Sequence, residues 1–221
     1  MSTTPKWMPP TAIALVSFEL GLGLAYFSTI FVRGEAIPLL DLNGLRSLPS
    51  WLQAAHLFAI GSLCIALLRH RHRMVHPISW FLPSMVAVLC FYGGLDELTK
   101  LHLWLNQVDW KLIYLGWLMA IPVLGRRDLV TIWRHHRRPM LWVLAGISVF
   151  VLGGFGAEAA RGAIASELAT YHSSRLLFLG EHLRVTLEES AELIGETIVL
   201  YGIARFTQQS LYPQPAMLAH R

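Results

Sequence analysis

The chain has 221 residues, of which 54% are hydrophobic and only 14% are charged, and its net charge is +4. Soluble globular domains carry about a quarter charged residues, so this composition excludes an ordinary soluble protein. A membrane crossing needs about 20 apolar residues, so the length allows about six crossings in one domain, residues 1–221, and little else. Cys64 and Cys90 both lie in apolar stretches, and their spacing indicates neither a disulfide framework nor a zinc site.

Six apolar runs follow one another along the chain. They cover residues 11–32, 51–68, 78–95, 112–125, 140–157 and 185–206. We therefore predict an all-α protein, a polytopic membrane bundle of about six transmembrane helices. Residues 161–180 mix apolar side chains with Ser, His, Glu and Arg, and this pattern predicts a helix that lies on the membrane surface.

Basic residues are concentrated in alternate loops. The second and fourth loops and the two ends of the chain carry Lys6, Arg69, Arg71, Arg73, Arg126, Arg127, Arg134, Arg137, Arg138, Arg205 and Arg221, with Asp128 as the one carboxylate among them. Because cytoplasmic loops are enriched in Lys and Arg, both termini are predicted to be cytoplasmic, and we expect a bacterial inner membrane. The same loops also suit an anionic lipid headgroup or an acidic partner. They are short, and they do not indicate nucleic acid as a partner.

The last apolar run contains a row of carboxylates. Glu188, Glu189, Glu192 and Glu196 fall within a stripe about 100° wide on an α-helix. Gly195 lies beside this stripe and is small enough to let a neighbouring helix approach closely. Four carboxylates on one face cannot all be ionised in an apolar setting without cations. They are therefore expected to hold protons, pair with Arg or Lys, or bind a metal ion.

Further polar residues lie toward the same outer side of the membrane. Asp96, Glu97, Lys100 and His102 follow the third apolar run, and His56 lies near the start of the second. Asp96 and Lys100 are spaced i, i+4 and can pair on a helix. Because three helices bring polar groups to one depth, we expect these residues and the carboxylate stripe to converge on one pocket.

Two segments carry a resemblance to a group of proteins. LDELTKLH and LEESAELIGE resemble segments of poorly characterised bacterial multi-pass membrane proteins, which have a Leu-Asp-Glu…His motif and a later Glu-Glu-x-x-Glu-x-x-Gly motif. The matching positions are Asp96, Glu97, His102, Glu188, Glu189, Glu192 and Gly195. The resemblance implies a membrane bundle with an acidic and histidine cluster, and no defined activity. Leu103 stands where an acidic residue usually follows the histidine, so a site that uses that acid is altered here.

Three functions fit this pattern. The first is a small accessory or assembly subunit of a larger membrane complex, or a homo-oligomer, in which the polar residues form a structural network. The second is a membrane enzyme with a divalent iron, manganese or zinc ion held by His56, Glu97, His102, Glu189 and Glu192. The third is a proton or cation carrier that uses Asp96, Glu188 and Glu196. The first is favoured, because the cluster lacks Glu-x-x-His spacing and the chain lacks an inverted repeat. Catalytic residues cannot be assigned from the sequence.

Overall fold

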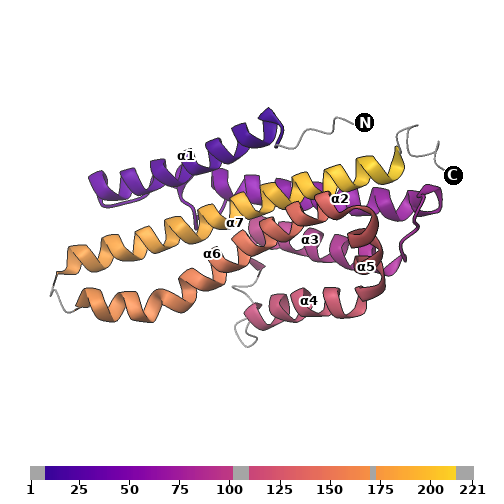
Figure 1. Ribbon diagram of the computed structural model, residues 1–221. Helices are drawn as coiled ribbons and strands as arrows, with labels where there is room; N and C mark the ends of the chain where they lie inside the picture. The colour runs from indigo at the N-terminus through magenta and orange to yellow at the C-terminus, as the bar shows by residue number, and fades with distance from the viewer. Residues whose placement is uncertain (1–7, 102–109, 170–172, 213–221) are drawn as a thin grey trace. The chain divides into compact units, whose positions relative to one another are not determined.

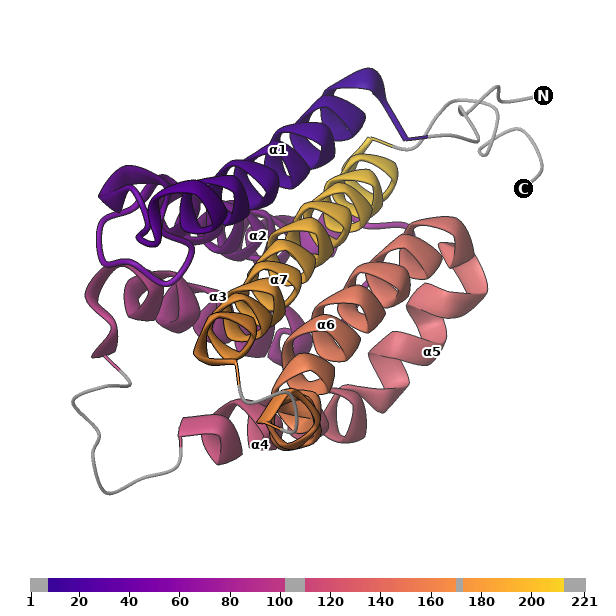
Figure 2. The same ribbon diagram turned by 90° about the vertical axis from the view of Figure 1, so that its left-hand side faces the viewer.

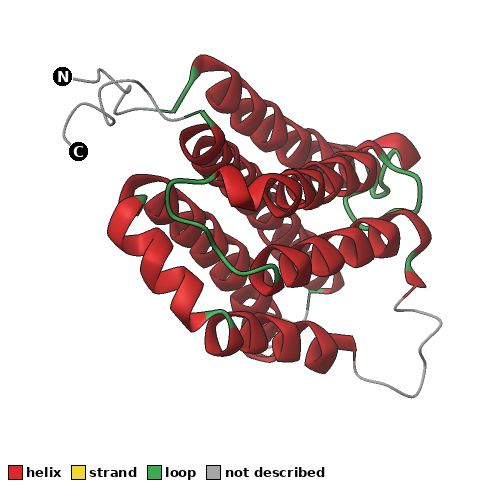
Figure 3. Ribbon diagram, turned by 90° about the vertical axis from the view of Figure 1, so that its right-hand side faces the viewer, coloured by secondary structure: helices red, strands yellow, loops and turns green. Residues whose placement is uncertain are grey.

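The computed structural model describes residues 8–101, 110–169 and 173–212. The described residues form α-helices and two short 3₁₀ turns, without a strand (Figures 1 and 3). The elements in these ranges are α1 (Pro10–Arg33), η1 (Pro38–Leu40), α2 (Leu48–His70), η2 (Arg71–Arg73), α3 (Phe81–Thr99), α4 (Trp110–Leu124), α5 (Arg126–His135), α6 (Arg137–Ala169) and α7 (Ser174–Leu211). The prediction of an all-α chain is confirmed.

Four helical segments in the described ranges are long and apolar enough to cross a membrane. They are Pro10–Arg33, Leu48–Arg73, Phe81–Thr99 and Arg137–Ala163. These correspond to the first, second, third and fifth predicted runs. The fourth run lies in α4, whose apolar stretch Ile113–Leu124 is shorter. The sixth run lies in α7, which spans 38 residues and carries the carboxylate stripe.

Two elements differ from the sequence prediction. Residues 161–180 do not form a separate surface helix, because α6 continues to Ala169 and α7 begins at Ser174. Alanine and leucine are strong helix formers, so both long helices extend well beyond their apolar runs. The second difference is α5, an amphipathic helix of ten residues in a loop that was expected only to carry charge.

The described chain divides into two compact units whose boundaries fall inside α2, α6 and α7. Unit 1 contains Ala54–Leu144 and the chain from Val199 onward, and unit 2 contains Met8–Gln53 and Ala145–Ile198.

Unit 1 is held together by two apolar clusters. The first joins the end of α2, the start of α3, α5 and α7 through Leu67, Met74, Ile78, Leu82, Ile132 and Phe206. The second joins α2 and α3 through Ile60, Cys64, Ala87 and Cys90. Both cysteines are free and buried. They therefore act as small apolar side chains, as their positions in apolar runs predicted.

Unit 2 is built around residues 174–198 of α7. α1 packs against this segment (Figure 2), and a small apolar cluster of Tyr26, Ile30, Leu42 and Val185 closes one end. Gly34 ends α1 in the left-handed region, at φ 76°, which lets the chain turn back toward Leu42. Most of the other buried positions in this unit carry polar side chains, and these define the candidate site.

Candidate functional site

Polar side chains line the contact between α1 and α7. The hydroxyl of Thr197 donates to Oε1 of Glu19 at 2.5 Å, and Glu19 is completely buried. Two turns further along α1, the Tyr26 hydroxyl lies 2.7 Å from Nδ1 of His182. Between these two contacts, a Cβ added to Gly23 would lie 2.3 Å from Oγ of Ser190. The two helices run antiparallel in close contact, and the pairs Glu19–Thr197 and Tyr26–His182 join them on either side of the glycine.

The contact between α6 and α7 depends on glycine. A Cβ added to Gly195 would lie 2.8 Å from both the carbonyl oxygen of Gly146 and the backbone nitrogen of Phe150. A Cβ on Gly153 would lie 2.0 Å from the Cβ of Ala191. The backbone atoms opposite Gly195 and the Cβ of Ala191, which is fixed directly to its backbone, cannot move aside as the end of a long side chain can. These two positions therefore accept only glycine at this helix separation. The prediction that Gly195 permits close helix approach is confirmed.

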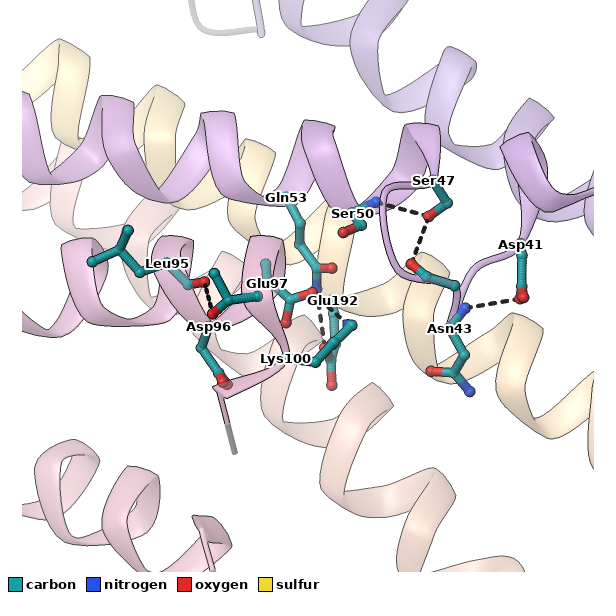
Figure 4. A network of polar contacts seen from close by, with 12 residues as sticks. Asp41, Asn43, Ser47, Ser50, Gln53, Leu95, Asp96, Glu97, Lys100 and Glu192 are labelled. Atoms are coloured by element: carbon teal, nitrogen blue, oxygen red, sulfur yellow. Dashed lines mark hydrogen bonds and ion pairs between the residues drawn. The ribbon is translucent and has the colours of Figure 1, made fainter. Parts of the chain in front are cut away.

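The carboxylate stripe of α7 lies between these two contact faces, and several of its members engage neighbours in unit 2. Arg184, 7% exposed, pairs with Glu188 and, at 2.9 Å, with Glu181. Nε2 of Gln53, at the start of α2, donates to Oε2 of Glu192 at 3.2 Å (Figure 4). The expectation that carboxylates in this stripe would pair with arginine therefore holds for Glu188.

Arg184 compensates the charge of two carboxylates in this region, Glu181 and Glu188. Its hydrogen bonds hold the pKa of Glu181 below its ordinary value, and the two carboxylates raise the pKa of the guanidinium. Arg161 of α6 lies 3.5 Å from the same Glu181. This pair joins α6 to α7 across the ends of the interval 161–180, which the sequence had suggested was a surface helix.

The segment before the Gln53 contact is fixed by its own hydrogen bonds. The backbone nitrogen of Ser50 donates to Oγ of Ser47 at the start of α2, and the backbone nitrogen of Asn43 donates to Asp41 at 3.2 Å (Figure 4). Ser47, Ser50 and Gln53 are all buried. A serine before the first turn is a common N-cap, so this local sequence fixes where α2 begins and where Gln53 points.

The candidate residues of α2 and α3 belong to unit 1. Lys100 donates to Oε2 of Glu97 at 2.8 Å, and the Tyr114 hydroxyl donates to Oδ2 of Asp96 at 3.0 Å. The spacing allowed an i, i+4 pair of Asp96 with Lys100, and the structure shows Lys100 paired with Glu97 at i, i+3. Lys100 ends α3 with φ 48°, so its side chain no longer follows the helical i, i+4 geometry. His56 is buried in α2, at 3% exposed.

The predicted metal site gains no support in the part of the chain that the structure describes. No group of three or more His, Cys, Asp or Glu side chains within residues 8–101, 110–169 and 173–212 could hold a metal ion. Of the five proposed ligands, Glu97 and Glu192 already engage Lys100 and Gln53. His102 lies outside the described residues. His56 and Glu97 are in unit 1, whereas Glu189 and Glu192 are in unit 2. The metal site stays a prediction.

Sequence reasoning missed three partners in the polar interior. Glu19 was not among the residues expected to converge, yet it contacts Thr197, which adjoins Glu196. Gln53 and Tyr26 were not singled out. A glutamine inside the apolar residues of α2 was a usable signal, because polar side chains in membrane helices usually have partners. Tyr26 gave no such signal, since tyrosine is common in apolar helices.

Within the described ranges, these features define an all-helical protein with four membrane-length apolar helices, in which unit 2 has the larger share of buried polar side chains. The chain belongs to the family described as Domain of unknown function (DUF8692), which matches residues 11–205. No curated protein and no solved structure matches the chain.

Proposed function

We propose that the chain is an integral protein of a bacterial inner membrane, with six crossings and both termini in the cytoplasm. The crossings are α1, α2, α3, α4, α6 and, within α7, residues 185–206. The 15 residues of α4 extend about 22 Å, less than the ~30 Å of a hydrocarbon core, so this helix needs a locally thinner bilayer or flanking residues that continue it. The arginine-rich loops after α2 and α4 support this orientation.

We further propose that the protein is a small accessory or assembly subunit of a larger membrane complex. The observation that carries this proposal is the pairing of the α7 charges inside their own unit, above all Arg184 with Glu181 and Glu188. Arg184 compensates two carboxylates of its own helix, and Arg161 of α6 joins Glu181 to the neighbouring helix at 3.5 Å, so these charges support helix structure and packing. The polar interior is therefore interpreted as a structural network, with function residing on an outer surface.

The outer face of α6 suits a partner helix. Its exposed positions Leu152, Gly156, Ala159, Ala163 and Ser166 lie within about 80° of one another on the helix, opposite the face that contacts α7. Open space surrounds Gly156, where an added Cβ would meet nothing within 4 Å. Small residues at i, i+4 spacing let two membrane helices approach closely, whereas lipid alone does not require them.

The test is copurification of cross-linked complexes from native membranes with two matched variants. Gly156→Leu places a large side chain on the outer face of α6. Gly21→Leu makes the same change on α1, where an added Cβ also meets nothing within 4 Å. We expect one stoichiometric partner, a different protein or a second copy, to be retained by wild type and Gly21→Leu and lost from Gly156→Leu.

The opposite results are equally informative. A monodisperse monomer in mild detergent that catalyses a reaction by itself would contradict the accessory role. If both glycine variants retained the partner equally, the outer face of α6 would not be the surface that binds it. Orientation is tested separately with a C-terminal fluorescent protein, which is expected to fluoresce because its chromophore matures in the cytoplasm.

A second candidate function is proton or cation handling, favoured by the buried contact between Glu19 and Thr197. A carboxylate fully buried in a membrane-length helix is a common feature of proton relays. In proteoliposomes with an imposed pH gradient, Glu19→Gln and Glu192→Gln should then abolish proton flux. Flux in either variant equal to that of wild type would exclude this function for that carboxylate.

A further inference from the structure

α5 is a short amphipathic helix on the surface of unit 1. Its ten residues extend about 15 Å, which is too short to cross a membrane. Ile132, 7% exposed, and the partly buried Leu129 pack into the apolar cluster formed by α2, α3 and α7. One side of α5 is therefore fixed to the unit, and the opposite side faces outward beside α4 (Figure 1).

The outward side of α5 combines apolar and cationic residues. Val130 and Trp133 are 43% and 37% exposed, and they lie within about 60° of each other on the helix. Arg127 and Arg134 are exposed on the adjacent flank. The guanidinium of Arg137, at the start of α6, lies 5.3 Å from the centre of the Trp133 ring. This combination of aliphatic, tryptophan and arginine side chains is typical of helices that lie at a lipid interface.

Positive charge continues around α5 on the neighbouring elements. His135 stacks on His76 at a ring separation of 3.5 Å, which brings the segment after η2 to the end of α5. Further exposed arginines lie at the two ends of α5 and on the elements that flank it: Arg69, Arg73, Arg126 and Arg138. Asp128 is the one acidic residue of α5, and its carboxylate accepts hydrogen bonds from the backbone and the hydroxyl of Ser79. These bonds hold α5 against the start of α3.

We propose that α5 and its flanking arginines form a binding surface for anionic phospholipid headgroups. Charge complementarity carries the assignment, because guanidinium groups bind phosphate oxygens in a fork and the exposed Trp133 and Val130 match the depth just below the headgroups. The inference requires the chain to lie in a membrane, and it is independent of the accessory role. Loss of a protein partner would therefore leave this surface unchanged.

The experiment uses the full chain in nanodiscs, whose two leaflets are identical, so that orientation has no effect. Thermal unfolding is followed as phosphatidylglycerol replaces phosphatidylcholine. We expect the midpoint temperature of unfolding to rise with the phosphatidylglycerol content and then to level off as the binding surface saturates. The apparent affinity should fall about tenfold or more in the triple variant Arg127→Gln, Arg134→Gln, Arg138→Gln, since each arginine near a surface contributes to lipid attraction. The effect should weaken as salt is raised.

A matched control removes three exposed arginines from unit 2, with Arg33→Gln, Arg46→Gln and Arg175→Gln, and should leave the phosphatidylglycerol effect unchanged. Trp133→Ala keeps the charge and should weaken the effect by severalfold. Equal response to both lipids, or equal loss in the two triple variants, would overturn the proposal. So would an equal rise in midpoint with inorganic phosphate, which indicates a simple anion site, or with a polyglutamate peptide, which indicates an acidic protein partner.

Discussion

The two units of this protein are stabilised by different chemistry. Unit 1 buries aliphatic side chains and two free cysteines in clusters that join α2, α3, α5 and the end of α7. It also buries the polar residues His56, Asp96, Thr207 and Ser210. Unit 2 has a smaller apolar cluster, and polar residues such as Glu19, Gln53, Arg184 and Thr197 make up a larger share of its buried positions. In lipid, apolar packing gains little from leaving water, so close glycine contacts and interhelical hydrogen bonds hold helices together. Unit 2 depends more on these specific contacts, and it should tolerate fewer substitutions.

The largest effect is expected where a helix contact accepts only glycine. Gly195→Ala places a methyl group against the backbone of Gly146 and Phe150, so it should lower the free energy of unfolding by about 3 kcal/mol. Gly21→Ala is the matched control in α1, where the methyl group meets open space and should stabilise the helix by about 0.5 kcal/mol. Unfolding in mixed detergent and dodecyl sulfate micelles measures both. Equal stability of the two variants would mean that unit 2 does not depend on this contact.

The next effect concerns the buried guanidinium. Arg184→Met removes the partner of Glu181 and Glu188, and it should lower the free energy of unfolding by about 2 kcal/mol, since a carboxylate loses its compensating charge. Arg33→Met is the control, because Arg33 is 57% exposed and its distance to Glu35 is 3.8 Å. A double variant with Glu188→Gln should recover part of the loss. Without any recovery, the pairing would not be the source of the stability.

Smaller effects are expected from two substitutions that change the polarity of a buried side chain, one in each unit. Thr197→Val removes the hydrogen bond to Glu19 and should lower the free energy of unfolding by about 1 kcal/mol. Cys64→Ser makes the reverse change in unit 1, placing a hydroxyl among Ile60, Ala87 and Cys90, and should also lower it by about 1 kcal/mol. If either swap were neutral, the contrast between a polar and an apolar unit would be weaker than the contacts indicate.

The smallest effect is a pH dependence in unit 2. Because Arg184 holds the pKa of Glu181 below its ordinary value of 4.5, the folded protein binds fewer protons than the unfolded chain in acid. The stabilisation is fully present above about pH 4.5 and is lost as the pH falls through the folded-state pKa. In the variant Glu181→Gln, the free energy of unfolding should therefore fall less steeply as the pH is lowered from 6 to 3. Superimposable profiles for wild type and variant would argue against the contact.

Hydrophobic runs predicted the fold class and most of its elements. Residues 11–32, 51–68 and 140–157 lie in helices of membrane length, and so does the run 78–95 from Phe81 onward. Periodicity also placed Glu188, Glu189, Glu192 and Glu196 on one stripe of α7, and it identified Gly195 as a contact position. These inferences succeed because helix formation and the face that a residue occupies depend on local spacing. The number of crossings and the orientation of the termini stay predictions.

Tertiary structure decided which groups meet. Spacing within α3 allowed Asp96 to pair with Lys100, and it gave no sign that Lys100 would pair with Glu97 or that Asp96 would accept a hydrogen bond from Tyr114 of a different helix. Charge along the chain suggested a surface helix at residues 161–180, whereas Arg161 and Glu181 join two long helices. The partners of Glu19 and Glu192 are Thr197 and Gln53, each more than 130 residues away. The sequence by itself determined an all-helical, lipid-suited chain with carboxylates on one helical face. Only the packing of α1, α2 and α6 around α7 decided their partners, because such contacts depend on how distant helices approach and not on local spacing.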